Sequence, residues 1–412
     1  MVKSARHLIS GERVAVKIID KIKLDKDSVD RMYNEVEHLK VAKHASIVQL
    51  YEAIDTPNSL YLILERADKG DLYDFIMENS TILENEEGEN CYAHERQTSG
   101  IGEALARRFF KQISEALYLC HSNNIVHRDL KPENVVIFTD KDESTKLRAK
   151  ITDFGFSNKF NPETQLLSTS CGSLAYSAPE VLLGDEYIAP AVDVWSLGVL
   201  LYMLVCGKAP FNETNDSETL TCILDCKFEI PPYVNPDCQH LIKSMIRLEP
   251  TERLTMGQVL NSSWVTQNES IPAVLSTEPV LDQPNAEEFK ELFAKLASHG
   301  FLYSNSEVFN SVTSSLVNPL GSTCALLLLQ IRKQRRRKIS EGKTPPTGNS
   351  RPASSLQLKI DMEIDDKKSL FSPDSFFQND EPDDMDDDDL LIQTISSNNS
   401  VHTGRMFSNM NN

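Results

Sequence analysis

Two short motifs in this 412-residue chain carry side chains that could do chemistry together. Residues 127–134 read His-Arg-Asp-Leu-Lys-Pro-Glu-Asn, and residues 153–155 read Asp-Phe-Gly. The motifs supply a candidate base in Asp129, a metal-binding amide in Asn134 and a metal-binding carboxylate in Asp153. This set suits phosphoryl transfer, which needs positioning and charge neutralisation more than covalent chemistry. Each residue alone could simply cap a turn, but their joint spacing favours the chemical interpretation.

The composition is that of a globular protein, with 40% hydrophobic and 25% charged residues. The formal net charge of −19 argues against general nucleic-acid binding. The eight cysteines show no paired metal-ligand spacing, which favours reduced thiols in a cytosolic or nuclear protein. The first residues lack the apolar core of a secretory signal. The apolar stretch 192–206 is too short for a membrane span and contains Asp193, so it predicts a buried helix and no membrane association.

The elements that must position these motifs begin with a strand-rich region. An apolar run at 14–19 predicts a strand, and residues 28–43 carry apolar positions at close to helical spacing. Residues 47–51 and 60–64 predict two further strands around the turn 56–58. Together they predict a small lobe with one helix.

After Glu65 the pattern becomes helical. Residues 72–77 and 104–120 predict helices, and the stretch 193–264 is mainly helical. The polar stretches 79–102 and 140–150 predict surface insertions.

The C-terminal third changes character twice. A polar, proline-containing stretch at 268–284 predicts a linker. Apolar faces within 289–296, 308–316 and 324–331 then predict three short helices. Beyond Ile339, Ser, Pro, Asn and Asp dominate, which predicts a disordered acidic tail.

Residues 12–264 as a whole resemble the catalytic domain of protein kinases, with the two motifs in the places of the catalytic loop and the metal-binding triplet. The resemblance implies an α+β, bilobal protein-kinase fold that uses ATP and Mg²⁺. It implies that Asp129 orients the substrate hydroxyl and that Lys131 neutralises charge on the transferred group, a lysine that marks serine/threonine specificity. It also implies that Asn134 and Asp153 hold magnesium.

The same resemblance implies a nucleotide side. Lys17, at the end of Val-Ala-Val-Lys, would hold the α- and β-phosphates. Glu35 would pair with Lys17, and Glu37 is the alternative partner. Leu64 would be the gatekeeper of a hinge, and the further nucleotide contacts would come from Glu65, Ala67, Asp71 and Val136. Asp71 is equally placed to cap the helix that begins at Leu72, and the two roles are compatible.

Further matches imply structural and regulatory roles. Arg253 would form a buried bidentate pair with Glu180, and Asp193 would accept hydrogen bonds from the catalytic-loop backbone. Thr169 would be the activating phosphosite, because a phosphate there adds roughly −1.5 to −2 charge and can draw the segment onto Arg128. An upstream activating kinase is therefore an expected partner, beside protein substrates.

A finer resemblance concerns three strings, at 170–180, 183–187 and 215–220. They are similar to those of sucrose-non-fermenting-related kinases, within the AMP-activated-kinase-related group of calmodulin-dependent-kinase-like kinases. That group carries a ubiquitin-associated-like domain directly after the kinase domain. The resemblance therefore implies such a domain at 287–338, and the alternative is a generic helical appendage that packs on the kinase.

One family feature is missing from the printed sequence. The family has Gly-x-Gly-x-x-Gly shortly before the Val-Ala-Val-Lys strand, but the sixteen residues before Lys17 contain only Gly11, which belongs to the following turn. The sequence thus predicts an N-terminally truncated small lobe without its first strand, and a weakened ATP affinity. Two functions stay open: a serine/threonine kinase, or a non-catalytic or weakly active kinase-fold scaffold.

The basic cluster at 332–338 is compatible with a nuclear-import signal or with a solvated helix end. We therefore expect a monomer in the nucleus and cytoplasm. The expected segments are a small lobe at 1–66, a large lobe at 67–265 with the insertion 79–102, a linker at 266–286, the ubiquitin-associated-like helices at 287–338 and the tail at 339–412.

Overall fold

The structure is a computed structural model, and it describes residues 1–82, 98–139, 147–168, 173–184, 186–211, 213, 215–267, 284–301, 303–313, 318–340 and 377–378. Most of the predicted insertion, linker and tail lies outside these residues. The chain divides into two compact units. Unit 1 comprises Met1, Lys17–Gln283 and Ser315–Asn318, and unit 2 comprises Val2–Val16, Pro284–Ser314 and Pro319–Asn412.

Unit 1 begins with a small sheet and one helix. The second half of β2 (Arg13–Asp20) is followed in the sheet by β4 (Ser59–Glu65) and then β3 (Leu50–Asp55). The short η1 (Lys21–Lys23) leads to α1 (Lys26–Val41), which begins where the Asp25 side chain accepts a hydrogen bond from the Ser28 amide at 2.8 Å. One face of α1 is buried, with Met32, Glu35, Val36, His38 and Leu39.

The predicted strand at 47–51 is displaced towards the C-terminus. Ile47 makes only an isolated bridge to Ile151, and β3 runs from Leu50 into the polar residues Glu52 and Asp55. A strand with one face towards solvent carries such polar residues, so the end of an apolar run did not mark the end of the strand.

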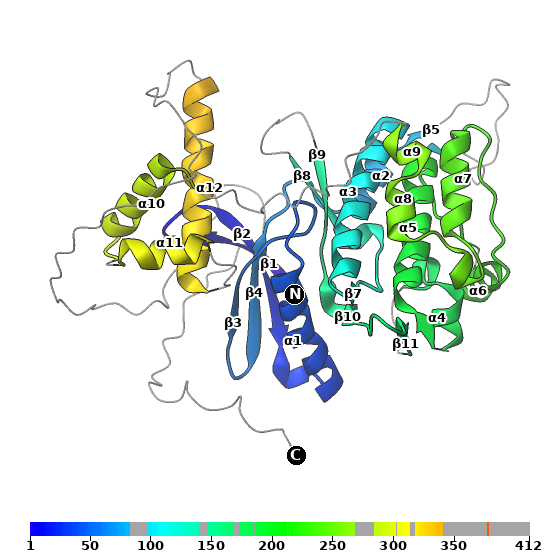
Figure 1. Ribbon diagram of the computed structural model, residues 1–412, viewed down its shortest axis with the longest axis horizontal. Coiled ribbons are helices and arrows are strands. Elements are labelled where there is room, and N and C mark those ends of the chain that lie inside the picture. Colours follow the sequence, from blue (N-terminus) through cyan, green and yellow to red (C-terminus); the bar gives the residue numbers. More distant parts are fainter. Residues whose placement is uncertain are drawn as a thin grey trace. The chain divides into compact units, whose positions relative to one another are not determined.

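After α1, the helices of unit 1 gather around the long, buried α5, as the cyan and green ribbons of Figure 1 show. Within the described residues, α5 is the one helix long and apolar enough to cross a membrane, and 83% of that stretch is buried inside the protein. It is therefore the core helix that the sequence predicted. The helices are α2 (Leu72–Asn79), α3 (Glu103–Ser122), α4 (Pro179–Leu183), α5 (Ala189–Cys206), α6 (Asp216–Leu224), α7 (Pro236–Met245), α8 (Met256–Leu260) and α9 (Ser263–Thr266).

Short strands and single helical turns frame the two motifs. The pairs are β7 (Ile125–Val126) with β10 (Asn158–Lys159), β8 (Val135–Thr139) with β9 (Leu147–Ile151), and β11 (Leu166–Leu167) with β12 (Tyr187–Ile188). The single turns are η2 (Pro132–Asn134), η3 (Phe154–Phe156), η4 (Leu174–Tyr176) and η5 (Pro250–Glu252).

The predicted insertion at 140–150 is wrong at its C-terminal end, because residues 147–150 belong to β9. The charged residues Arg148 and Lys150 gave this segment a loop-like composition. Lys150 is nevertheless buried, because its ammonium group donates to the Glu65 carboxylate at 2.6 Å.

The two ends of the stretch 79–102 meet in a short antiparallel pair, β5 (Thr81–Ile82) with β6 (Thr98–Ser99). The chain then packs directly on α5: the Ile101 amide donates to the Leu204 carbonyl at 3.0 Å. Gly100 has φ +26°, and a Cβ atom there would lie 2.0 Å from the Leu204 carbonyl oxygen. Only glycine fits this approach.

Unit 2 contains a strand that the apolar pattern of the sequence did not predict. β1 (Val2–His7) precedes β2, and Gly11 lies in the turn between them with φ +65°. The inward positions of β1 are Ala5 and His7, which are small or polar, so apolar alternation was too weak to reveal the strand. A two-residue strand, β13 (Phe377–Gln378), pairs with β1.

The described part of unit 2 also contains three helices, α10 (Ala286–Ser298), α11 (Asn305–Thr313) and α12 (Pro319–Ser340). Their apolar cluster includes Leu292, Leu296, Val308 and Leu327, and Ile9 packs against it. This contact explains why residues 2–16, predicted as part of the small lobe, group with these helices.

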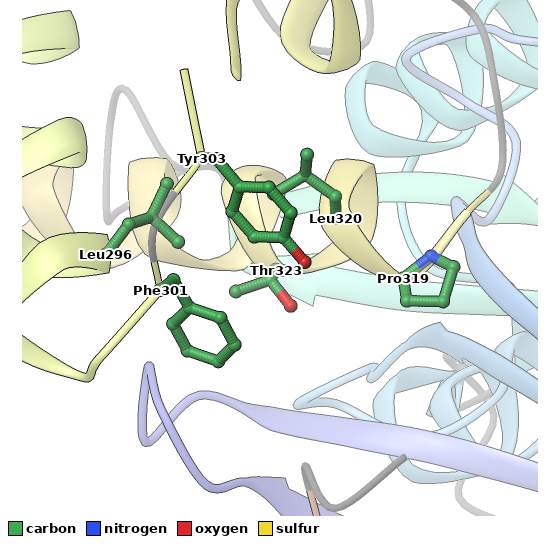
Figure 2. A pocket seen from close by; sticks show the side chains of 6 residues that line it. All are labelled: Leu296, Phe301, Tyr303, Pro319, Leu320 and Thr323. Atoms are coloured by element: carbon green, nitrogen blue, oxygen red, sulfur yellow. The ribbon is translucent and has the colours of Figure 1, made fainter. Parts of the chain in front are cut away.

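α12 carries the basic cluster, and part of it is paired. Arg332 donates to both oxygens of Glu288 at 3.1 Å, and Arg335 lies 3.1 Å from Glu291. A pocket beside α10 and α12, with the aromatic ring of Tyr303 over it, is shown in Figure 2. Its lining residues are Leu296, Phe301, Tyr303, Pro319, Leu320 and Thr323.

Candidate active site

The loop 127–134 is fixed to α5 through its backbone. The buried Asp193 carboxylate accepts hydrogen bonds from the amides of His127 at 2.9 Å and Arg128 at 2.8 Å. Burial alone would raise the pKa of Asp193, but its hydrogen bond with His121 at 2.8 Å and the nearby imidazoles lower it. Asp193 therefore stays ionised and holds the loop, the role implied for it by sequence. The contribution of His121 was not predicted.

Three polar side chains meet at Asp129. Asn134 Nδ2 donates to the Asp129 carbonyl at 2.8 Å and to its carboxylate at 2.9 Å. Lys131 Nζ lies 3.3 Å from the same carboxylate and donates to Ser173 Oγ at 2.7 Å, and this hydroxyl lies 3.3 Å from Asp129 Oδ1. The sequence predicted all of these residues except Ser173, which lies far along the chain and belongs to a residue type common in loops.

Lys17 lies between two carboxylates. Its Nζ is 2.7 and 3.0 Å from the oxygens of Glu35 and 2.8 Å from Asp153 Oδ1. Glu37, the alternative partner, instead pairs with Lys40 at 2.8 Å and is exposed. The helical phase of α1 explains the difference, because Glu35 lies on the buried face and Glu37 does not.

The three groups shift one another's pKa. Burial lowers the pKa of Lys17, but the Glu35 and Asp153 charges outweigh it and raise the pKa overall. Burial raises the pKa of Asp153, but the Lys17 charge and hydrogen bonds lower it below its ordinary value. For Glu35 burial is the larger effect, and its pKa is raised.

Asn134 and Asp153 have the donor chemistry that a Mg²⁺ ion requires. Asp153 is in the left-handed conformation, with φ 59°, and caps η3 by accepting from the Gly155 amide at 3.3 Å. Both hydrogen bonds of the Asn134 amide described above use Nδ2, so its oxygen is the atom suited to a cation. The Thr152 amide donates to the Asn134 carbonyl at 2.9 Å, which ties the two residues' backbones together. The residues fit the ion.

The four residues implied in adenine and ribose binding lie along β4, α2 and β8. The Glu65 amide donates to the Gln49 carbonyl at 2.9 Å, and its carboxylate is held by Lys150. Ala67 lies two residues after the end of β4. Asp71 accepts from the Asp74 amide at 2.9 Å and so caps α2, the alternative role that the sequence allowed. Its backbone also forms a bridge with Val136.

The Arg253 guanidinium and the Glu180 carboxylate form the predicted bidentate pair. Arg253 Nη1 and Nη2 donate to the two Glu180 oxygens at 2.6 and 2.7 Å. Arg253 is buried, and its guanidinium also lies 5.0 Å from the centre of the Trp195 ring. The pair therefore joins α4 to the turn η5 and has a structural role. The predicted phosphosite Thr169 lies outside the described residues.

Comparison with known proteins agrees with this geometry. A model of the protein kinase domain matches residues 1–265. The SNF-related serine/threonine-protein kinase of Homo sapiens is 42% identical over 369 residues, which cover 89% of this chain and 45% of that protein. The Mus musculus protein of that name gives the same identity over 46% of its length. The serine/threonine-protein kinase SIK3 homolog of Danio rerio is 36% identical over 362 residues, 87% of this chain and 28% of that protein. This chain thus spans less than half the length of these relatives.

Proposed function

Because this chain belongs to the protein kinase family, we propose that it transfers the γ-phosphate of ATP to serine or threonine hydroxyls of protein substrates. The observation that carries the proposal is the joint assembly of Asp129 with Asn134 and of Lys17 with Asp153. The scaffold alternative is not favoured, because the polar groups needed for transfer come together. The relatives named above also carry the name of serine/threonine-protein kinases.

The chemistry follows from the charges at the site. Asp129 accepts the proton of the substrate hydroxyl and orients it, and Lys131, beside it, neutralises charge on the phosphoryl group. Lys17 holds the α- and β-phosphates, with Glu35 fixing its ammonium group. Asn134 and Asp153 would hold Mg²⁺, which supplies charge neutralisation at the phosphates when bound. Positioning and electrostatics thus account for the transfer.

The direct test is phosphorylation of a generic serine peptide with labelled ATP by the full 412-residue chain. Removing the base in Asp129→Asn should lower kcat by about 10²- to 10⁴-fold. Asp153→Asn should abolish the activity, and Asp237→Asn, an exposed aspartate on α7, should leave it unchanged. Equal residual activity in the parent and the Asp153→Asn variant would mean that a contaminating kinase was measured and that the proposal is wrong.

We further propose that phosphorylation of Thr169 by an upstream kinase activates the chain. The proposal rests on the family resemblance and on Arg128, whose Nε donates to the Phe156 carbonyl at 2.7 Å and so links the catalytic loop to the segment that leads to Thr169. After treatment with an upstream kinase, Thr169→Ala should phosphorylate the peptide more slowly than the parent. Equal rates would contradict the proposal.

For unit 2 we propose a ubiquitin-associated-like domain that acts structurally and does not bind ubiquitin, in a monomeric protein of the nucleus and cytoplasm. The support is the three-helix cluster and the pairing of Arg332 and Arg335 with α10, which gives part of the basic cluster a structural role. Monoubiquitin added to the ¹⁵N-labelled chain should leave its spectrum unchanged.

A fluorescent fusion of the chain should appear in both the nucleus and the cytoplasm. Strict exclusion from the nucleus would contradict the proposed localisation.

A further inference from the structure

A buried histidine on α1 touches the turn that follows Asp153. His38 is 2% exposed, and its Nδ1 lies 2.6 Å from the hydroxyl oxygen of Ser157, which is 3% exposed. Ser157 directly follows η3, whose first residue is Phe154. His38 lies three positions after Glu35 on the buried face of the same helix. One helix therefore contacts both Lys17 and the turn behind Asp153.

The hydrogen-bond geometry assigns the proton in this contact. Ser157 Oγ donates to the Phe154 carbonyl at 2.5 Å, and a hydroxyl has a single proton to donate. The bond between Ser157 and His38 must then be donated by Nδ1 of the ring. Burial lowers the pKa of His38 to about 4, helped by the charges of Lys159 and Arg128 and opposed by Glu37. The ring is thus neutral near pH 7 and carries its proton on Nδ1.

The turn Phe154–Ser157 is held from two sides. From α1, His38 donates to Ser157, which in turn donates to Phe154. From the catalytic loop, Arg128 Nε donates to the Phe156 carbonyl at 2.7 Å. Phe154 itself is fully buried. Asp153 directly precedes this turn, so the orientation of its carboxylate towards Lys17 depends on where the turn is held.

We propose that His38 is a positioning residue for the phosphoryl transfer proposed above. Its hydrogen bond to Ser157 locks the turn that carries Asp153 to the helix that carries Glu35. Lys17 is then held between both carboxylates in one geometry. The inference rests on the proposed function and adds to it a residue that touches neither nucleotide nor substrate.

The test compares variants that keep or remove the donor. His38→Leu keeps an apolar volume but removes the donor, and Ser157→Ala removes its partner. Each should raise KM for ATP and lower kcat, by about 3- to 10-fold in kcat/KM, the value of one hydrogen bond. His38→Asn places an amide donor where Nδ1 lies and should restore kcat/KM to within about twofold of the parent.

A double-mutant cycle and a matched control separate positioning from plain stability. The His38→Leu and Ser157→Ala double variant should be no slower than the slower single variant, because both remove the same bond. His44 is a second buried histidine. Its Nδ1 accepts a 3.0 Å hydrogen bond from the Ser46 amide, so this bond does not hold the turn Phe154–Ser157. His44→Leu should lower the melting temperature and leave kcat and KM unchanged.

The outcomes are distinct for the two proposals. In ¹⁵N spectra of the full chain, His38 should show the Nδ1–H tautomer and should lose that preference in Ser157→Ala. If the parent shows no phosphorylation that depends on Asp153, the proposed function fails, and this inference fails with it. If the parent is active but His38→Leu matches its kcat and KM, or if the single effects multiply in the double variant, only this inference is overturned.

Discussion

The two halves of the candidate active site are held by different kinds of contact. The substrate half, Asp129, Lys131 and Asn134, lies on one short loop whose backbone amides bond to Asp193 in the core helix α5. The nucleotide half, Lys17, Glu35 and Asp153, comes from β2, from α1 and from the residue before η3. Folding of the large helical part fixes the substrate half directly. The nucleotide half is correct only when α1 and the turn after Asp153 are both in position.

The largest expected effect is on the anchor of the substrate half. Asp193→Ala leaves two buried amides, those of His127 and Arg128, without their acceptor. It should lower the free energy of unfolding by about 3–5 kcal/mol, measured by urea denaturation. Asp237→Asn is the exposed control and should change it by less than about 0.5 kcal/mol. If Asp193→Ala lowers the free energy of unfolding by less than about 1 kcal/mol, the substrate half is not more firmly anchored than the nucleotide half.

In the nucleotide half, a smaller change should affect function more than stability. Glu35→Gln weakens the hold on Lys17 and should raise KM for ATP by about 10- to 100-fold. The unfolding free energy should stay within about 1 kcal/mol of the parent, because the cost of burying the carboxylate offsets its attraction to Lys17.

The matched control is Glu37→Gln, two positions along α1, where the carboxylate is exposed. This variant should have the KM of the parent. Equal KM values for Glu35→Gln and Glu37→Gln would remove the basis for assigning Glu35 to the nucleotide half.

Acid should lower the free energy of unfolding gradually. Burial lowers the pKa of His38 and of His44 to about 4, against about 6.5 in the unfolded chain. Well above pH 6.5 these imidazoles are neutral in both the folded and the unfolded chain, so they contribute no pH dependence to the free energy of unfolding. Between pH 6.5 and 4 the unfolded state takes up protons first, so stability falls by up to about 1.4 kcal/mol per pH unit for each histidine.

Urea denaturation at pH 7, 6 and 5 measures this slope. Burial lowers the pKa of His7 to about 4 as well, so three histidines contribute to the slope. In His44→Gln one of these contributions is gone, so the slope should be shallower than in the parent. The same slope in both proteins would show that the acid sensitivity arises elsewhere.

The contrast between the halves also explains what the sequence could predict. Asp129, Lys131 and Asn134 are near neighbours in the chain, so their types and spacing were sufficient. The pairing of Lys17 with Glu35, 18 positions apart, was implied only by the family resemblance. The contact of Lys17 with Asp153, 136 positions away, was not predicted. Ser173, His38 and Lys150 were not found, because a serine, a histidine or a lysine carries no periodic signal that distinguishes a buried partner from a solvated side chain. β1 was missed for a similar reason, since its inward residues are not strongly apolar.

The strand pair β5–β6, together with the close approach of Gly100 to Leu204, has a practical consequence for protein engineering. It brings the two ends of the stretch between Ile82 and Thr98 together and secures them to Leu204, independently of what connects them. Doubling the length of a connection whose ends are already joined costs only about 0.6 kcal/mol of chain entropy. The connection between Ile82 and Thr98 is therefore suited to accept a reporter or an affinity tag. Replacement of Gly100 would instead separate this segment from Leu204, because a Cβ atom does not fit there.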